Sequence, residues 1–272
     1  MNLENYFISQ FHSKSIGDDG ALMGKEVYSM DAFFENIHFK KSWLSYYQIA
    51  KKAMVINISD AIAMNAKPKY ALLSVAMPSG IKKSQMRELV CGFEDGAKEY
   101  GVEIIGGDTI SNAKLDISIT IISQTSKPLR RVGARVGDMV GFTGKLGNSK
   151  KDLQKLMNLG KIHKNSKFVN IKLKDKFITN SIRNLKAGMD ISDGLFSELQ
   201  KISDINRVGF KFLQHISKDV GCSGEEYEML FVFDKRDLKT MKRRAKQSRT
   251  EITIFAQVTR QRYANRCKSH HF

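Results

Sequence analysis

Apolar residues recur with two different periods in the first 125 residues, which predicts alternating strands and helices. Short apolar runs, or strict apolar–polar alternation, predict strands at 27–34, 70–77, 102–105 and 115–123. Apolar residues three or four positions apart predict helices over 42–66 and 84–100. We expect Pro68 to stop the first helix and Gly101 to follow the second, and we interpret GGDT at 106–109 as a turn.

The second half of the chain continues the alternation after a basic, Gly-containing break at 127–138. A short strand at 139–144, a helix that opens at ISDGL (191–195) and a strand at 228–233 are expected there, and a basic helix follows. The Lys-rich stretch 148–186 is a candidate basic lid. We therefore predict an α/β (α+β) protein of two domains, 1–136 and 137–272.

Composition is that of a globular chain, and charge is spread unevenly. The 272 residues carry a net charge of +17, and 28 of the 45 Lys and Arg residues lie in 137–272. The basic runs lack interleaved aromatic residues, so a nucleic-acid-binding protein is the less favoured reading. No apolar run could span a membrane, no secretory signal opens the chain, and three distant cysteines do not predict a disulfide framework. We expect a cytoplasmic protein.

Aspartate placement is the main chemical feature of the chain. Nearly all of seven aspartates stand where a predicted element ends, beside small residues: Asp18, Asp19, Asp31, Asp60, Asp108, Asp190 and Asp193. Each alone is typical of a turn or helix cap. Together in one cleft they would repel one another unless cations neutralised them, and oxygen ligands favour Mg²⁺, Mn²⁺ or Ca²⁺. Several such ions on a polyphosphate indicate nucleotide-dependent phosphoryl transfer.

Other motifs for nucleotide or metal chemistry are absent from the sequence. TGKLGNSKK at 143–151 lacks the spacing of a P-loop, and neither GxGxxG after a strand nor the kinase HRD and DFG motifs occur. CKSHHF at 267–272 would need a further ligand to hold zinc.

The ordered motifs GDDGA, YSMDAFFENIHF, NISDAIAMNAKP, GGDT, LRRVGARVGD, MDISDGL and SGEEYEML resemble those of the thiamine-monophosphate kinase family. That family belongs to the superfamily of aminoimidazole ribonucleotide synthetase and selenophosphate synthetase. The resemblance implies a two-domain aminoimidazole ribonucleotide synthetase-like fold, with the N-terminal sheet completing a barrel across a homodimer and a C-terminal α/β domain. It also implies ATP-dependent, Mg²⁺-assisted phosphorylation of thiamine monophosphate to thiamine diphosphate.

The resemblance further implies a role for each matching residue. The implied metal ligands are Asp19, Asp31, Asp60, Asp108, Asp190 and, on a further ion, Asp193, with help from Ser29 and the backbone of Met30. The implied nucleotide contacts are Gly107, Asp108, Arg131 and Ser192. The implied acceptor contacts are His38 at the phosphate, Glu225 or Glu226 at the thiamine end, and Phe272.

The chain departs from the family pattern at the acceptor side. Compared with the family, it has fewer residues after Gly147 and between Asp219 and Gly221. Ser223 stands where the family usually has a glycine, and Ser269 stands where it commonly has an aromatic residue. A superfamily enzyme with another acceptor, or an inactive nucleotide-binding relative, therefore stays open as an alternative.

Overall fold

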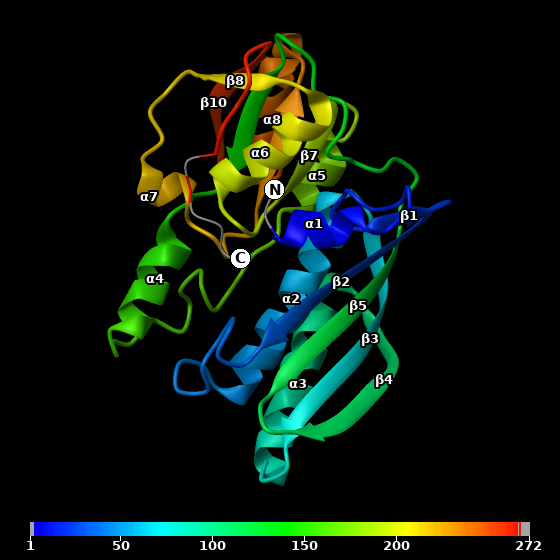
Figure 1. The fold of residues 1–272 in the computed structure, drawn as a ribbon, viewed down its shortest axis with the longest axis vertical. Helices are drawn as coiled ribbons and strands as arrows, with labels where there is room; N and C mark the ends of the chain where they lie inside the picture. The colour runs from blue at the N-terminus through cyan, green and yellow to red at the C-terminus, as the bar shows by residue number, and fades with distance from the viewer. Residues whose placement is uncertain (1–2, 266, 268–272) are drawn as a thin grey trace.

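The computed structural model describes residues 3–265 and 267, and it contains two five-stranded sheets (Figure 1). The first has the order β1-β2-β5-β3-β4. Its strands are β1 (Ala21–Met23), β2 (Glu26–Phe34), β3 (Lys67–Pro78), β4 (Glu103–Asn112) and β5 (Asp116–Gln124). Only β3 and β4 pair in parallel. The sheet is open in this single chain.

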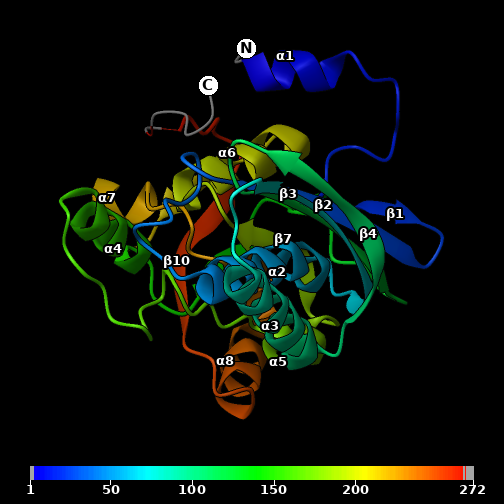
Figure 2. The same ribbon diagram turned by 90° about the horizontal axis from the view of Figure 1, so that it is seen from below.

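Two long helices, α2 (Tyr46–Ala63) and α3 (Lys83–Tyr100), cover one face of this curved sheet (Figure 2). Ser45 begins α2 with a capping box, in which its hydroxyl accepts from the Gln48 N–H. Gly101 ends α3 in the left-handed conformation, as the sequence predicts. Pro68 does not end α2 directly, because the helix stops at Ala63 and Pro68 already belongs to β3.

The second sheet has the order β7-β9-β6-β10-β8, and every neighbouring pair is antiparallel. Its strands are β6 (Met139–Thr143), β7 (Leu185–Ile191), β8 (Gly209–Phe212), β9 (Glu228–Phe233) and β10 (Ile252–Thr259). The remaining helices are α1 (Leu3–Ser9), α4 (Asn148–Met157), α5 (Asp175–Ser181), α6 (Leu195–Asn206), α7 (Lys218–Gly221), the 3-10 turn η1 (Lys235–Asp237) and α8 (Leu238–Gln247). The mixed α/β class is confirmed. The domain boundary at 136/137 stays a prediction.

The turn expected at GGDT is wrong, because these residues continue β4. The pairing with β3 shifts register at this point, so that Ala71 faces Ile104 and Leu72 faces Gly106. A Cβ on Gly107 would overlap the Leu73 carbonyl oxygen, so only glycine allows the two strands to approach here.

The prediction of a basic lid over 148–186 is wrong for the part of that stretch from Phe168 to Ile178. Phe168, Ile171 and Leu173 are buried in the core that α2 and α3 form with the first sheet. Phe177 and Ile178 of α5 are buried in a separate cluster under the second sheet. This stretch therefore joins the two halves of the molecule.

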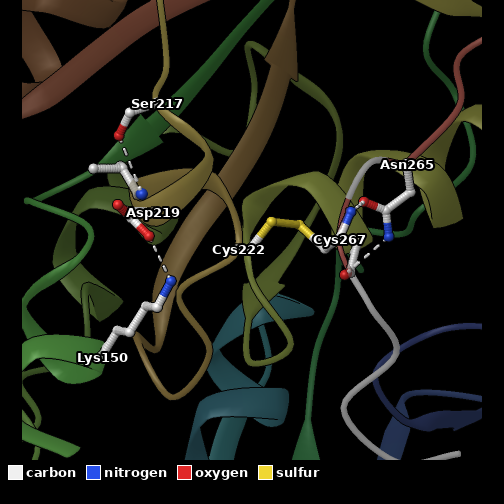
Figure 3. The surroundings of a disulfide bond; sticks show 8 residues. Lys150, Ser217, Asp219, Cys222, Asn265 and Cys267 are labelled. Carbon is white, nitrogen blue, oxygen red and sulfur yellow. Dashed lines mark hydrogen bonds and ion pairs between the residues drawn. A yellow bond between two sulfur atoms is a disulfide. The ribbon is translucent and has the colours of Figure 1, made fainter. Parts of the chain in front are cut away.

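A disulfide joins Cys222, at the end of α7, to Cys267 after β10, although the cysteine spacing did not predict one (Figure 3). The two Cα atoms are 5.6 Å apart and 45 residues apart in sequence. Nearby, Lys150 of α4 pairs with Asp219 of α7. Cys91 is free and exposed.

No helix in the described part of the chain is both long enough and apolar enough to cross a membrane.

Candidate active site

A cavity of about 510 Å³ opens between the two halves of the molecule. It is lined by β2, the end of α2, the exit of β7, the start of α6 and the loop before β9. The lining residues are Asp18, Asp19, Met30, Asp31, Ala32, Phe34, His38, Ile56, Asp60, Arg131, Asp190, Ser192, Asp193, Lys201, Glu225 and Tyr227. Most of the predicted site residues thus meet in one place.

Three carboxyl groups from three different elements form the centre of the cavity. Asp31 lies on β2, where its backbone N–H donates to the Asn57 side chain at 2.7 Å. Asp60 lies in the last turn of α2, and Asp190 lies on β7, where it accepts from the Ser59 hydroxyl at 2.6 Å. The three carboxyl groups are close enough for the charges of Asp31 and Asp190 to act on Asp60.

Burial and mutual repulsion raise the pKa of all three groups. Desolvation, with Glu225 and Asp19 nearby, raises the pKa of Asp31 to about 6. Desolvation also raises the pKa of Asp60 well above its usual value, and the neighbouring Asp31 and Asp190 add to the effect. The pKa of Asp190 is raised well above its usual value by desolvation and then by Asp19. Burial and the neighbouring carboxylates therefore disfavour the charged form of each group, and a bound cation would favour it.

Arginines from the 127–138 segment reach the loop that precedes β1. The Arg131 guanidinium contacts Asp19 Oδ1 through Nη2 at 2.6 Å and through Nε at 3.1 Å. Asp18 accepts from the Arg130 side chain at 2.6 Å and from the Arg131 backbone at 2.8 Å. Burial still raises the pKa of Asp19 despite the pairing with Arg131.

Lys201 of α6 is a cation of the cavity that sequence reasoning missed. Its Nζ lies 2.9 Å from Asp193 Oδ2 and 2.8 Å from Glu198 Oε2. These carboxylates, Glu198 first, hold its pKa above the usual value despite burial. One lysine in a helix forms no motif, so nothing in the spacing could have singled it out.

Ser192 lies between β7 and α6 and lines the cavity. Its hydroxyl is 3.4 Å from Glu198 Oε1, which also accepts from the Asp193 N–H at 2.9 Å. It does not itself begin α6, because Gly194 is the cap residue. His38 enters the cavity from the turn after β2, where its Nδ1 accepts from the Phe34 N–H at 2.9 Å.

The two neighbouring glutamates have different surroundings. Glu225 lines the cavity, whereas Glu226 is fully buried away from it. Glu226 Oε1 accepts from the Gly147 N–H at 2.7 Å and from the Ser223 hydroxyl at 2.6 Å, and its Oε2 contacts Lys167 at 2.9 Å. Glu226 therefore holds the start of α4, and only Glu225 is placed to meet a ligand.

Some predicted site residues lie elsewhere. Ser29 lies on β2 with its side chain buried toward Asn57, and it does not line the cavity. The exposed Met30, the next residue on β2, does line it. Gly107 and Asp108 lie on β4, with β5 and β3 between them and β2, which is about 14 Å at the usual strand spacing. Phe272 falls outside the described residues.

The acidic residues do not by themselves form a closed metal site. Among residues 3–265 and 267, no group of three or more His, Cys, Asp or Glu side chains is arranged to hold an ion. Mg²⁺ usually keeps several waters and takes only one or two carboxylates together with substrate phosphates. The arrangement fits ions shared with a ligand.

Comparisons with known proteins place the chain in a family. Residues 17–125 match the model for the N-terminal domain of AIR synthase related proteins. "Thiamine-monophosphate kinase" of Bacillus subtilis is 33% identical over 73% of this chain and 66% of its own length. The protein of that name from Buchnera aphidicola (subsp. Schizaphis graminum) is 30% identical over 90% of this chain and 84% of its own length.

Solved structures agree on the fold. The structure described as "AaThiL complexed with AMPPCP and TMP" superposes with a TM-score of 0.88 at 23% identity, covering 99% of this chain and 96% of that chain. Because the Buchnera relative matches along most of both chains, the family inferred from the motifs is confirmed. The chain belongs to the thiamine-monophosphate kinase family.

Proposed function

We propose that this protein transfers the γ-phosphoryl group of ATP to thiamine monophosphate, which yields thiamine diphosphate. The observation that carries the proposal is the cavity in which Asp31, Asp60 and Asp190 converge from β2, α2 and β7. Curated relatives that are similar to this protein over most of its chain are named for this activity. The acceptor phosphate is already ionised, so in-line attack on the γ-phosphorus needs no strong general base.

Mg²⁺ is the metal that the donor atoms favour. The candidate ligands are oxygen atoms only, and burial together with the neighbouring carboxylates raises the pKa values of Asp31, Asp60 and Asp190, an effect that a bound cation would oppose. Asp19, Asp31, Asp60 and Asp190 would hold the ions, with Asp193 on a further one. When bound, Mg²⁺ would neutralise charge on the phosphate oxygens.

The cations of the cavity would bind the nucleotide phosphates. Arg131 presents a planar fork suited to phosphate oxygens, and it would exchange Asp19 for a phosphate when that carboxylate takes a metal ion. Lys201 and the Ser192 hydroxyl lie beside Asp193 at the start of α6, where further phosphate contacts are within reach. These groups would align the reacting atoms.

The acceptor would lie between His38 and Glu225. Both line the same cavity as the central aspartates. His38 would meet the phosphate of thiamine monophosphate, and the Glu225 carboxylate would face its cationic thiazolium ring.

A homodimer would complete this site. Residues that are paired across neighbouring strands have their side chains on the same face of the sheet. Asp108 is paired with Ser74, Ser74 with Ser118, and Ser118 with Ala32, so Asp108 shares a face with Ala32, which lines the cavity. The same open face carries exposed apolar side chains: Tyr28, Met30, Tyr70, Leu72 and Ile110. Such a face is typical of an interface. A second copy packed on it would cover these residues and bring its own Gly107 and Asp108 to the cavity.

The test is formation of thiamine diphosphate by the purified protein with ATP, Mg²⁺ and thiamine monophosphate. Asp60→Asn should lower kcat by about 100-fold or more, since one charge that positions the phosphates is lost. Lys51→Met is the matched control, because Lys51 lies on α2 and pairs with Glu99 outside the cavity. Nucleotide binding without thiamine diphosphate formation would overturn the proposal and point to another acceptor or an inactive relative.

A further inference from the structure

Lys52 is a buried cation directly behind the wall of the cavity. It lies on α2, its side chain has no exposed surface, and its Nζ is 2.8 Å from Glu225 Oε2. It is not itself a lining residue. Its ammonium group also stands 3.5 Å from the ring centroid of Phe168 and 5.7 Å from that of Phe33.

Burying a lysine ammonium has a large desolvation cost, which contacts must offset. The carboxylate of Glu225 offsets it by charge, and the face of the Phe168 ring does so by its quadrupole. An apolar residue of similar length in the core would avoid that cost. The position therefore requires a positive charge for a reason other than packing.

That reason is the position of Glu225. Its Oε1 lies 3.2 Å from the Tyr227 hydroxyl, and its backbone N–H donates to the Ser192 carbonyl at 2.7 Å. Its φ of 59° is left-handed, a conformation that a glutamate adopts only when its contacts hold it there. Lys52 also offsets the repulsion between this carboxylate and Asp31.

We propose that Lys52 is a positioning residue for the acceptor site, which holds the Glu225 carboxylate from behind so that it faces the cationic ring of thiamine monophosphate. This inference rests on the proposed function. Lys52 belongs to the first half of the chain and Glu225 to the second, so the ion pair also fixes the acceptor loop relative to α2.

Steady-state kinetics test the inference, because the substitution should change the KM for thiamine monophosphate and not the KM for ATP. Lys52→Met should raise the KM for thiamine monophosphate by about 10- to 100-fold, the usual loss when a group that orients a ligand contact is removed. The KM for ATP should change less than about twofold, because ATP does not contact Glu225 in the proposed site. Lys51 directly precedes Lys52 on α2, and Lys51→Met should leave both KM values unchanged.

A double-mutant cycle separates positioning from general damage. Glu225→Gln should raise the KM for thiamine monophosphate by itself, and adding Lys52→Met should raise it no further, since Lys52 then has nothing to hold. If Lys52→Met alone does not fold, comparing Glu225→Gln with the double variant still decides the question. If Glu225→Gln does not fold because it leaves Lys52 without its carboxylate, comparing Lys52→Met with the wild type decides it. The inference would be overturned if the effects of the two substitutions on the KM for thiamine monophosphate multiplied in the double variant. Equal increases in the KM for thiamine monophosphate and the KM for ATP would also overturn it.

Calorimetric binding of thiamine monophosphate keeps the two proposals apart. Wild-type protein that binds it without turnover would refute the proposed reaction, while weaker binding by Lys52→Met would still support the role of Lys52. Wild-type turnover together with unchanged binding by Lys52→Met would refute only the inference. Protein that neither binds nor phosphorylates thiamine monophosphate would overturn both.

Discussion

At the residue scale, the central aspartates work against the stability of the fold. Asp31, Asp60 and Asp190 line one cavity from three different elements, and each has a raised pKa because burial and neighbouring carboxylates disfavour its charged form. In the folded protein these groups therefore bind protons more tightly than in the unfolded chain. By linkage, the free energy of unfolding must fall as those protons are lost.

We expect the Mg²⁺-free protein to become less stable as pH rises. For Asp31 the fall begins near its unfolded pKa of 3.8 and is complete above about 6. That difference corresponds to about 3 kcal/mol. Asp60 and Asp190 extend the fall to higher pH. Thermal unfolding in EDTA should show a lower Tm at pH 7 than at pH 5, and added Mg²⁺ should raise Tm more at pH 7.

Asp60→Asn provides the control for this pH dependence, because it removes one charge without changing side-chain size. It should reduce both the loss of Tm with pH and the gain from Mg²⁺. Carboxyl groups with a lowered pKa, such as Glu99 and Asp219, titrate below this pH range and do not interfere. Equal Mg²⁺ effects at pH 5 and pH 7 would contradict the expectation.

At the element scale, one glutamate determines where α4 begins. Glu226 accepts from the Gly147 N–H, contacts Lys167 and is fully buried. Glu226→Gln would leave the Lys167 ammonium without one of its two carboxylate partners, and loss of a buried charge partner typically costs about 3 kcal/mol or more. Urea unfolding should show this loss as a lower midpoint.

Lys150→Met on the same helix is the comparison for Glu226→Gln. Lys150 pairs with Asp219, whose side chain is 89% exposed, and an exposed pair of this kind contributes little to stability. A Glu226→Gln variant as stable as Lys150→Met would mean that the buried carboxylate does not hold α4.

The long periodic elements could be predicted from the sequence, and the irregular ones could not. The positions of α2 and α3 follow from apolar spacing, a serine cap and a C-terminal glycine. GGDT resembles a turn in composition, and only the close passage of β3 beside Gly107 explains why it is a strand. Glu225 and Glu226 are adjacent, so sequence alone could not tell which one meets the cavity. The backbone is left-handed at Glu225 and Tyr227, and this local conformation determines which of the two glutamate side chains faces the cavity.

At the scale of the whole molecule, the residues predicted for the site lie on two separated strands of the first sheet, β2 and β4. Spacing and resemblance predicted that Asp31, Asp60 and Asp190 converge, and the structure places all three in the cavity. Asp108 could not be placed by such reasoning, because its distance from the cavity depends on strand order. The disulfide was equally beyond prediction, since Cys222 and Cys267 meet only through the fold.

If the partner supplies Asp108, two inactive variants should restore each other. Mixed dimers of Asp60→Asn and Asp108→Asn, isolated with two affinity tags, would contain one intact and one doubly damaged site. They should show about half of the wild-type activity. Each variant alone should be inactive.

Sites formed within a single chain predict the opposite result. Every site in the mixed dimer would then carry one substitution, and no activity would return. A protein that is monomeric by light scattering at assay concentration would refute the dimer directly.

The burial of Phe168, Ile171, Leu173 and Tyr227 against the first sheet also affects how the chain can fold during synthesis. All five strands of that sheet have been made once residue 124 is added, but within the described residues its core extends to Tyr227. At ordinary elongation rates the ribosome needs on the order of 5 to 20 s to span that interval. During this time the nascent sheet exposes apolar surface that only later residues cover. The two halves therefore mature together, and a chain released early would have an incomplete core as well as an incomplete site.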